Sequence, residues 1–319
     1  MQFRHNFRGE SGKTRTMERY NLVHVCIKSG GELMHRDEED YRSGISRMAL
    51  AAYRTGTRIF AFAFMSNHIH IVAQSPDISC FVSNYRNAYT RWFNVKYRRK
   101  GRLGDRYFHT EPLDTLYRTL HAVNYVLRNP VHHLVADTAM GYEFCSARYV
   151  FASDLCIDEC RAGKSRSALC SKNASIPDSY WLNGEGMISP KSFLEISAVE
   201  RLYMTAKNFL YYINRPSYAD LDKPDKDEKP LNIGQIEPDF DVTELQQNER
   251  RRSVKGYAKD MDICRIIDKE ILAGKSYAQI TDQEKNRIAY LVSRHLPGCS
   301  LKQIWRCLAI QDCSRPAAA

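Results

Sequence analysis

The first 150 residues alternate between two patterns of hydrophobic and polar positions. Alternate side chains of a β-strand face the same way, whereas an α-helix places apolar residues three or four positions apart on one face. The two patterns predict strands over 20–28, 57–65, 69–73 and 106–113, and helices over 37–55, 77–100 and 114–129. This β-α-β-β-α-β-α order predicts an α+β fold, a ferredoxin-like antiparallel sheet with helices on one face.

The pattern changes after residue 151. Residues 158–175 are polar and predict an exposed loop, whereas residues 192–213 again have helical spacing. Residues 216–241 hold four prolines and eight acidic residues against three lysines, a composition typical of an extended linker. The second half therefore predicts separate pieces joined by polar chain rather than a continuation of the first fold.

Three further helices are predicted near the C-terminus, over 259–273, 282–295 and 301–310. Sequences that fit a capping box precede the last two, at 281–284 and 300–303. These helices form either a helix-turn-helix-like DNA-binding module or a small helical bundle. The predicted organisation is an extension at 1–19, an α+β domain at 20–151, a polar insertion with a helical segment at 152–215, an acidic proline-rich linker at 216–250 and a helical domain at 251–319.

The charge of the chain is concentrated in its first half. Residues 1–150 carry 22 Lys and Arg against 13 Asp and Glu, a balance of +9, whereas residues 151–319 carry 25 against 24, a balance of +1. A local basic excess is typical of proteins that bind nucleic acid. Apolar residues make up 43% of the chain, which excludes wholesale disorder.

Composition also predicts where the protein works. No stretch approaches eighteen uninterrupted apolar residues, so no transmembrane helix and no membrane partner are predicted. Residues 1–19 are polar and charged, and the ten cysteines show no regular spacing, so we expect free thiols in a reducing cytoplasm. A zinc cluster at Cys156, Cys160 and Cys170 is disfavoured because no CxxC pair or nearby histidine completes it.

Two histidines begin the third predicted strand. His68 and His70 flank a single residue, so both side chains face the same side of the sheet. Two imidazoles on one face can share a divalent metal ion. The alternative interpretation is a pair of ordinary half-buried histidines.

A tyrosine and an asparagine lie at the end of the helix predicted over 114–129. Tyr125 and Asn129 are four positions apart, so both lie on one face of its last turn, and Pro130 follows. Taken alone, such a tyrosine is usually a packing residue and such an asparagine a cap. The pair gains meaning only together with the histidines.

The segment 86–106 is strongly basic and contains aromatic residues. It holds eight Lys and Arg side chains against a single acid, Asp105. Cations neutralise phosphates and aromatic faces stack on unpaired bases, whereas the alternative is a solvated helix end. We expect Tyr89, Trp92 and Phe93 to lie mainly in the core. The candidate DNA contacts are Arg91, Lys96, Arg98, Arg99, Lys100, Arg102 and Arg106.

These motifs together resemble those of single-tyrosine HUH transposases. Residues 64–72 (FMSNHIHIV) resemble the histidine strand of that family, and residues 124–131 (NYVLRNPV) resemble its nucleophile helix. Residues 89–94 and 104–108 lie where the family has similar runs. The resemblance covers about residues 20–150 and is greatest to the branch called REP-associated tyrosine transposases.

The resemblance implies a role for each of these residues. His68 and His70 would bind Mg²⁺ or Mn²⁺, with Asn129 as a third ligand where better-known members have glutamine. Tyr125 would attack single-stranded DNA, presented beside a hairpin, and form a covalent 5′-phosphotyrosine, as in DNA transposition. Both monomers and homodimers occur in the family, so the oligomeric state stays open.

Two other functions remain compatible with the sequence. A DNA-hairpin-binding regulator would keep the fold without the chemistry, although His68, His70 and Tyr125 are all present. A replication-initiation or relaxase-type nickase would use similar groups, but relaxases place the tyrosine before the histidines. The order found here favours the transposase.

Overall fold

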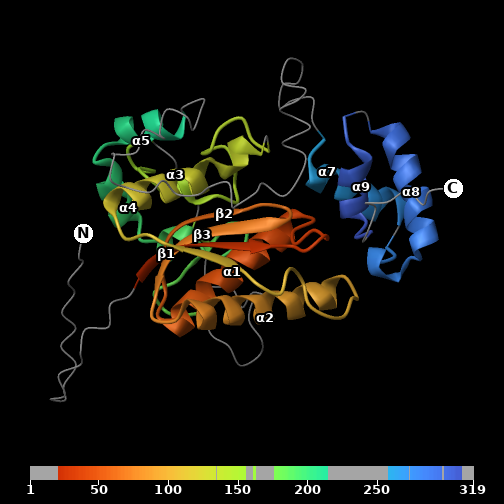
Figure 1. The fold of residues 1–319 in the computed structure, drawn as a ribbon, viewed down its shortest axis with the longest axis horizontal. Helices are drawn as coiled ribbons and strands as arrows, with labels where there is room; N and C mark the ends of the chain where they lie inside the picture. Colours follow the sequence, from red (N-terminus) through yellow and green to blue (C-terminus); the bar gives the residue numbers. More distant parts are fainter. Residues whose placement is uncertain are drawn as a thin grey trace.

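The structure is a computed structural model that describes residues 21–133, 135–155, 161–162, 176–214, 258–272, 274–296 and 298–310 (Figure 1). The predicted extension at 1–19 and the linker at 216–250 lie outside the described residues. So do nearly all of the polar segment 158–175 and the three cysteines Cys156, Cys160 and Cys170.

A four-stranded antiparallel sheet forms the centre of the protein. Its strands are β1 (Asn21–Lys28), β2 (Arg58–Phe64), β3 (His68–Ser75) and β4 (His109–Pro112), in the order β2-β3-β1-β4. This is the order of a ferredoxin-like sheet, in which the first and third strands lie side by side at the centre. The predicted fold class is therefore confirmed.

Helices cover both faces of this sheet (Figure 1). The helices α1 (Glu38–Thr55) and α2 (Ile78–Lys96) pack on one face, as in the predicted sandwich, and α3 (Leu116–His132) packs on the opposite face. Strand alternation divides the core accordingly: Ile69 and Ile71 of β3 pack with α1 and α2, whereas Val72 packs with α3. His68 and His70 consequently face α3.

Local contacts explain where the observed elements differ from the prediction. The strand predicted over 106–113 begins only at His109, and the carbonyls of Asp105 and Arg106 before it accept from Arg86 of α2 rather than from a strand. The helix predicted over 77–100 ends at Lys96, and Arg98 has a left-handed backbone with φ 49°. The basic residues after Lys96 therefore lie in a loop rather than on a helix.

The third helix continues past its proline. It begins at Leu116, where Thr115 caps the Arg118 amide, and it includes Pro130. Proline usually ends a helix because it lacks an N–H, but the turn continues here as the His133 amide donates to the Asn129 carbonyl at 3.0 Å. His132 therefore belongs to the helix and His133 caps it.

Two short helices replace the one predicted over 192–213. They are α4 (Ile196–Tyr203) and α5 (Ala206–Ile213), separated at Met204, which has φ 63°, and at Thr205, which caps α5. Both pack on the α3 side of the sheet. The described part of the insertion also contains a 3₁₀ turn at Pro190–Ser192 and a small ribbon of β5 (Arg161–Ala162) and β6 (Leu182–Asn183). A further 3₁₀ turn, Ser146–Tyr149, lies just before the insertion.

The C-terminal helices form a small bundle. Its elements are α7 (Asp260–Ile266), a π-helical turn (Ile267–Ile271), a 3₁₀ turn (Tyr277–Gln279), α8 (Asp282–His295) and α9 (Leu301–Cys307). The predicted capping box at Thr281 and Glu284 is present, whereas Ser300 caps α9 while Gln303 turns to Asp260 instead. Ile304 and Cys307 of α9 are buried in the shared core, as in the bundle alternative. Within the described ranges, no helix is long and apolar enough to cross a membrane.

Candidate active site

The structure brings the histidine pair and the tyrosine helix together on the α3 face of the sheet. His68 and His70 are 4% and 1% exposed, and their ring centroids lie 4.9 Å apart. The Tyr125 ring lies edge-on to His70 at 5.1 Å, and the Asn129 Oδ1 atom lies 3.1 Å from His68 Nε2. Strand alternation and helical spacing had placed each pair on one face, and the packing of α3 joins the two pairs.

The hydrogen bonds around His68 leave a lone pair without a proton partner. Burial lowers the pKa of His68 to about 4, so the imidazole is neutral near pH 7 and carries one N–H. In the tautomer in which His68 Nδ1 holds this one proton, it donates to the Asn67 Oδ1 atom, which lies 2.7 Å away. The lone pair of Nε2 then faces Asn129 Oδ1, a second acceptor, and a cation between the two atoms would satisfy both.

The residues at this position fit a divalent metal ion by donor type and spacing. Imidazole and amide oxygen are ligands that Mn²⁺ and Mg²⁺ sites use. Adjacent ligands of an octahedral ion at ~2.1 Å lie about 3.0 Å apart, close to the 3.1 Å between His68 Nε2 and Asn129 Oδ1. Within the described parts of the chain, no group of three or more His, Cys, Asp or Glu residues forms a metal site, so the amide oxygen would have to complete the set.

His24 is a site residue that the sequence analysis missed. It lies on β1, and its Nε2 atom is 3.0 Å from His70 Nδ1. Burial lowers the pKa of His24 to about 4 and that of His70 well below its usual value, so a single proton lies between two neutral rings. When His70 donates that proton, its Nε2 lone pair is available for a cation.

The hydroxyl of Tyr125 is held in its protonated form. The side chain is 3% exposed, and burial raises its pKa above the ordinary value of a phenol. The rings of His24 and His70 both meet it edge-on, with His24 at 5.8 Å between centroids. A buried phenol beside neutral imidazoles must lose its proton before or during any nucleophilic attack.

His133 is a second residue to which the sequence gave no role. Its ring lies 4.8 Å from His68, and its Nε2 atom has no hydrogen-bond partner among the described residues. Burial, and then the neighbouring His68 and His132, lower the pKa of His133 well below its usual value. Its position depends on α3 continuing through Pro130, which the sequence pattern did not predict.

The candidate DNA contacts divide into two groups. Lys96 forms ion pairs of 2.7–2.9 Å with Asp37, Glu39 and Asp40, so it joins α2 to the start of α1 and is not an open contact for DNA. Arg99 is paired with Glu32. The remaining candidates are exposed: Arg91, Arg98, Lys100, Arg102 and Arg106.

The aromatic residues of the basic segment behave as expected of core residues. Tyr89 and Phe93 are 1% and 0% exposed, and Trp92 is half-buried with Lys96 over its ring at 5.1 Å. None of these three rings presents an open face for base stacking. A role for this segment in DNA binding would therefore rest on its charges.

Comparison with known proteins finds similarity among solved structures but no match to a family model or a curated protein. A solved structure described as the REP-associated tyrosine transposase bound to a REP hairpin is similar over 52% of this chain and 99% of that chain. The sequence identity is 16% and the TM-score is 0.38. Similarity at this level assigns no role to any residue of this chain.

Proposed function

We propose that the protein cleaves and rejoins single-stranded DNA through a covalent bond to Tyr125, with a divalent metal ion held by His68, His70 and Asn129. The observation that carries this proposal is the pair of acceptors, His68 Nε2 and Asn129 Oδ1, facing each other at 3.1 Å. They lie on the same side of the sheet as the Tyr125 ring, which contacts His70. The motifs of residues 64–72 and 124–131 support the same chemistry.

The reaction balances without an external energy source. The Tyr125 oxygen loses its phenolic proton and forms a bond to phosphorus, the bond from phosphorus to the 3′ oxygen breaks, and that oxygen takes up a proton, so no proton is gained or lost overall. The products are a 5′-phosphotyrosine and a free 3′-hydroxyl, so a second 3′-hydroxyl can reverse the step and join strands. A bound Mg²⁺ or Mn²⁺ would supply Lewis-acid polarisation of the phosphate.

The residues of this chain have separate tasks in that reaction. By accepting from Nδ1, Asn67 can fix the proton of His68 on that atom, and His24 can fix that of His70 in the same way. Tyr125 is the nucleophile, and α3 carries it together with Asn129, so one helix sets both positions. The proposed substrate is a single strand beside a DNA hairpin.

A second function has its own supporting observation. The amide of Asn129 can also turn so that its nitrogen donates to His68, and this arrangement needs no cation. Together with the burial of Tyr125, it would make the cluster a structural one, in a DNA-hairpin-binding regulator without catalysis. The two functions differ in whether a covalent adduct forms.

End-labelled DNA tests the proposal. Single-stranded DNA from the flanks of the gene is incubated with the protein and Mg²⁺ or Mn²⁺, with the label at one end. A 5′-phosphotyrosine retains the DNA on the 3′ side of the cut, so a 3′ label should remain on denatured protein while a 5′ label is released. Tyr125→Phe should abolish the adduct, whereas Tyr117→Phe, on the same helix, should not. Absence of any metal-dependent adduct would favour the regulator.

A further inference from the structure

The C-terminal bundle is fixed against the α+β domain by buried polar contacts. Arg36, only 1% exposed, donates to Asp268 at 2.7 Å and lies over the Tyr277 ring, 4.1 Å from its centroid. Asp260 of α7 accepts from Ser66, just before the histidine strand, at 2.6 Å. Moving the bundle away would leave these buried polar groups without partners, which costs free energy. These contacts therefore hold the bundle in one position.

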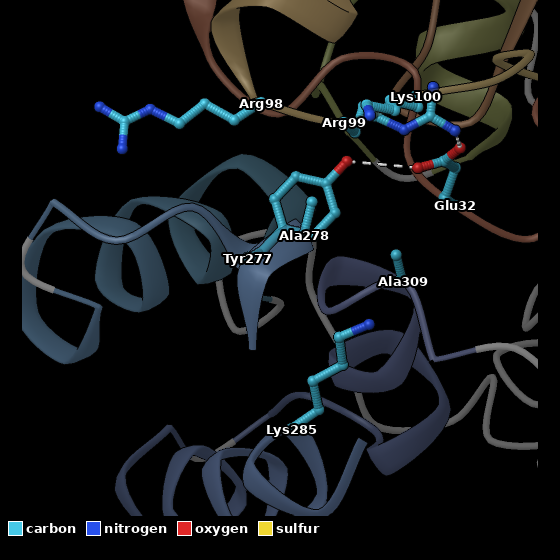
Figure 2. A pocket seen from close by; sticks show the side chains of 8 residues that line it. All are labelled: Glu32, Arg98, Arg99, Lys100, Tyr277, Ala278, Lys285 and Ala309. Atoms are coloured by element: carbon cyan, nitrogen blue, oxygen red, sulfur yellow. Dashed lines mark hydrogen bonds and ion pairs between the residues drawn. The ribbon is translucent and has the colours of Figure 1, made fainter. Parts of the chain in front are cut away.

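A cavity of about 430 Å³ lies where the two parts meet (Figure 2). Its lining carries four cationic side chains against one carboxylate, Glu32. Figure 2 shows Glu32 bonded to Arg99 and to the Tyr277 hydroxyl, whereas Lys285 extends toward the cavity from α8. The full lining is Glu32, Arg98, Arg99, Lys100, Tyr277, Ala278, Lys285 and Ala309.

The loop that brings three of these cations is rigidly held. Asn94 of α2 donates to the Gly101 carbonyl at 2.8 Å and accepts from Arg99 at 2.6 Å, and Ser276 of the bundle donates to the Tyr97 carbonyl. Arg98 has a left-handed backbone, which costs free energy for a residue with a side chain and is concentrated at functional sites.

Two of the four cations that line this cavity have no counterion among the described residues. Among the residues that the structure describes, neither Arg98 nor Lys100 has a salt-bridge partner, and Lys285 has only Asp282 at 3.5 Å. Glu32 is already engaged by Arg99. Like charges held near one another without counterions favour the binding of an anion.

The loop also leads to the candidate active site. The Asp105 amide donates to the Lys28 carbonyl at 3.0 Å, and Lys28 pairs with His68 across β1 and β3. The basic loop is therefore linked through β1 to the strand that carries His68 and His70.

We infer that this cavity binds the phosphodiester backbone of the single-stranded DNA substrate, with Lys285 of the bundle and Lys100 of the basic loop contacting phosphate from opposite walls. The inference rests on the proposed function for the identity of the ligand. It gives the C-terminal bundle a direct part in the DNA site without any reading of bases, because phosphate contacts carry no sequence information.

The test compares two charge reversals on one helix in the full-length chain. Lys285→Glu alters the cavity, whereas Arg287→Glu changes the same charge at an exposed position of α8 outside the lining. Both are made with Tyr125→Phe, so that binding of a fluorescent single strand is measured without cleavage. We expect Lys285→Glu to weaken binding about fivefold more than Arg287→Glu. It should also lower the salt slope by roughly 0.7 for one lost contact.

A second variant changes affinity in the opposite direction. Glu32→Gln keeps an acceptor for Tyr277 but removes the negative charge of the cavity, so it should tighten DNA binding. A structural role alone would weaken binding, or leave it unchanged, and lower the melting temperature. Equal effects of Lys285→Glu and Arg287→Glu would overturn the inference.

Competition with free anions separates the possible sources of phosphate. Inorganic phosphate and a nucleoside triphosphate should compete with the single strand only weakly. Each carries one to three phosphates, whereas a DNA strand contacts the protein through a longer series of them. If Lys285→Glu abolished triphosphate binding and left DNA binding intact, the cavity would be a nucleotide site and the inference would fail. The adduct assay tests the proposed function independently of this inference. If wild type forms the adduct but Lys285→Glu binds DNA normally, only the inference about the cavity fails. If Lys285→Glu weakens binding but wild type forms no adduct, only the proposed function fails.

Discussion

The histidine cluster on the α3 face and the cavity beside the C-terminal bundle differ in burial and in charge. In the histidine cluster, the rings of His24, His68, His70 and Tyr125 are buried and neutral near pH 7. Single hydrogen bonds, such as the one between His24 and His70, orient the imidazoles. In the cavity beside the bundle, four of the eight lining side chains are cationic, and two of these, Arg98 and Lys100, are exposed. The first arrangement depends on geometry and the second on net charge, so mutations should separate chemistry from affinity.

The largest expected effect is in the histidine cluster. His68→Ala or His70→Ala removes a lone pair proposed to hold the metal ion, so adduct formation should fall by roughly a thousandfold or more. Binding of single-stranded DNA should change little, because neither side chain is charged near pH 7. His109→Ala, an exposed histidine on β4, is the matched control. Equal losses of cleavage and binding would indicate that the cluster is structural.

His24 should have a smaller effect of the same kind. His24→Phe keeps a ring beside Tyr125 but loses the hydrogen bond to His70, so we expect adduct formation to fall about 10–100-fold. More Mn²⁺ should be needed for half-maximal rate. His24→Gln offers an acceptor to His70 and should recover part of the loss, which a purely packing role would not produce.

Neighbouring lysines and arginines of the basic segment should separate stability from affinity. Lys96→Met leaves Asp40, which is fully buried, without its cation and should destabilise the fold by roughly 3 kcal/mol. The double change of Arg98 and Lys100 to alanine should cost little stability but lower the salt slope of DNA binding by roughly 1.4, at 0.7 for each contact. Denaturant unfolding and salt titration measure the two quantities. If Lys96→Met lowered the salt slope of DNA binding and the double variant lowered stability instead, the roles assigned to these residues would be wrong.

A further expected effect is a dependence of stability on pH. His24 and His35 have pKa values lowered by burial to about 4 and about 3, so the unfolded chain binds more protons below pH 6.5. Stability should therefore be full above pH 6.5 and fall progressively toward pH 4. Denaturant unfolding in the presence of a chelator measures it, and His35→Gln should make the decline shallower. If the denaturant concentration at the midpoint of unfolding rose on acidification, the burial of these two rings as neutral groups would be contradicted.

Much of the fold followed from local patterns. The succession of strands and helices along the first half, the shared face of His68 and His70 and the shared face of Tyr125 and Asn129 depend only on periods of two and 3.6 residues. His24 could not be found in this way, because its place beside His70 depends on the register between β1 and β3. A histidine at an alternate position of a strand gives no sign of which strand will pair with it.

The docking of the bundle also lay beyond sequence reasoning. The contact of Arg36 with Asp268 joins residues that are 232 positions apart, and no periodicity records such a pair. The sequence did not anticipate that α3 would continue through Pro130, since a proline normally predicts the end of a helix. The cavity could not be predicted for two reasons. It requires the docked bundle, and its cations at 98–100 lie in a loop where the sequence predicted a helix.

The most direct test of the central claim is to locate the covalent bond. After incubation with single-stranded DNA and Mn²⁺, the protein is digested with nuclease and protease, and the peptides are examined by mass spectrometry. We expect one peptide from α3 to carry a nucleotide through a phosphate on Tyr125, and this peptide should be absent without metal and in Tyr125→Phe. A nucleotide on another residue, or a Tyr125 that stays unmodified while DNA is cut, would contradict the account.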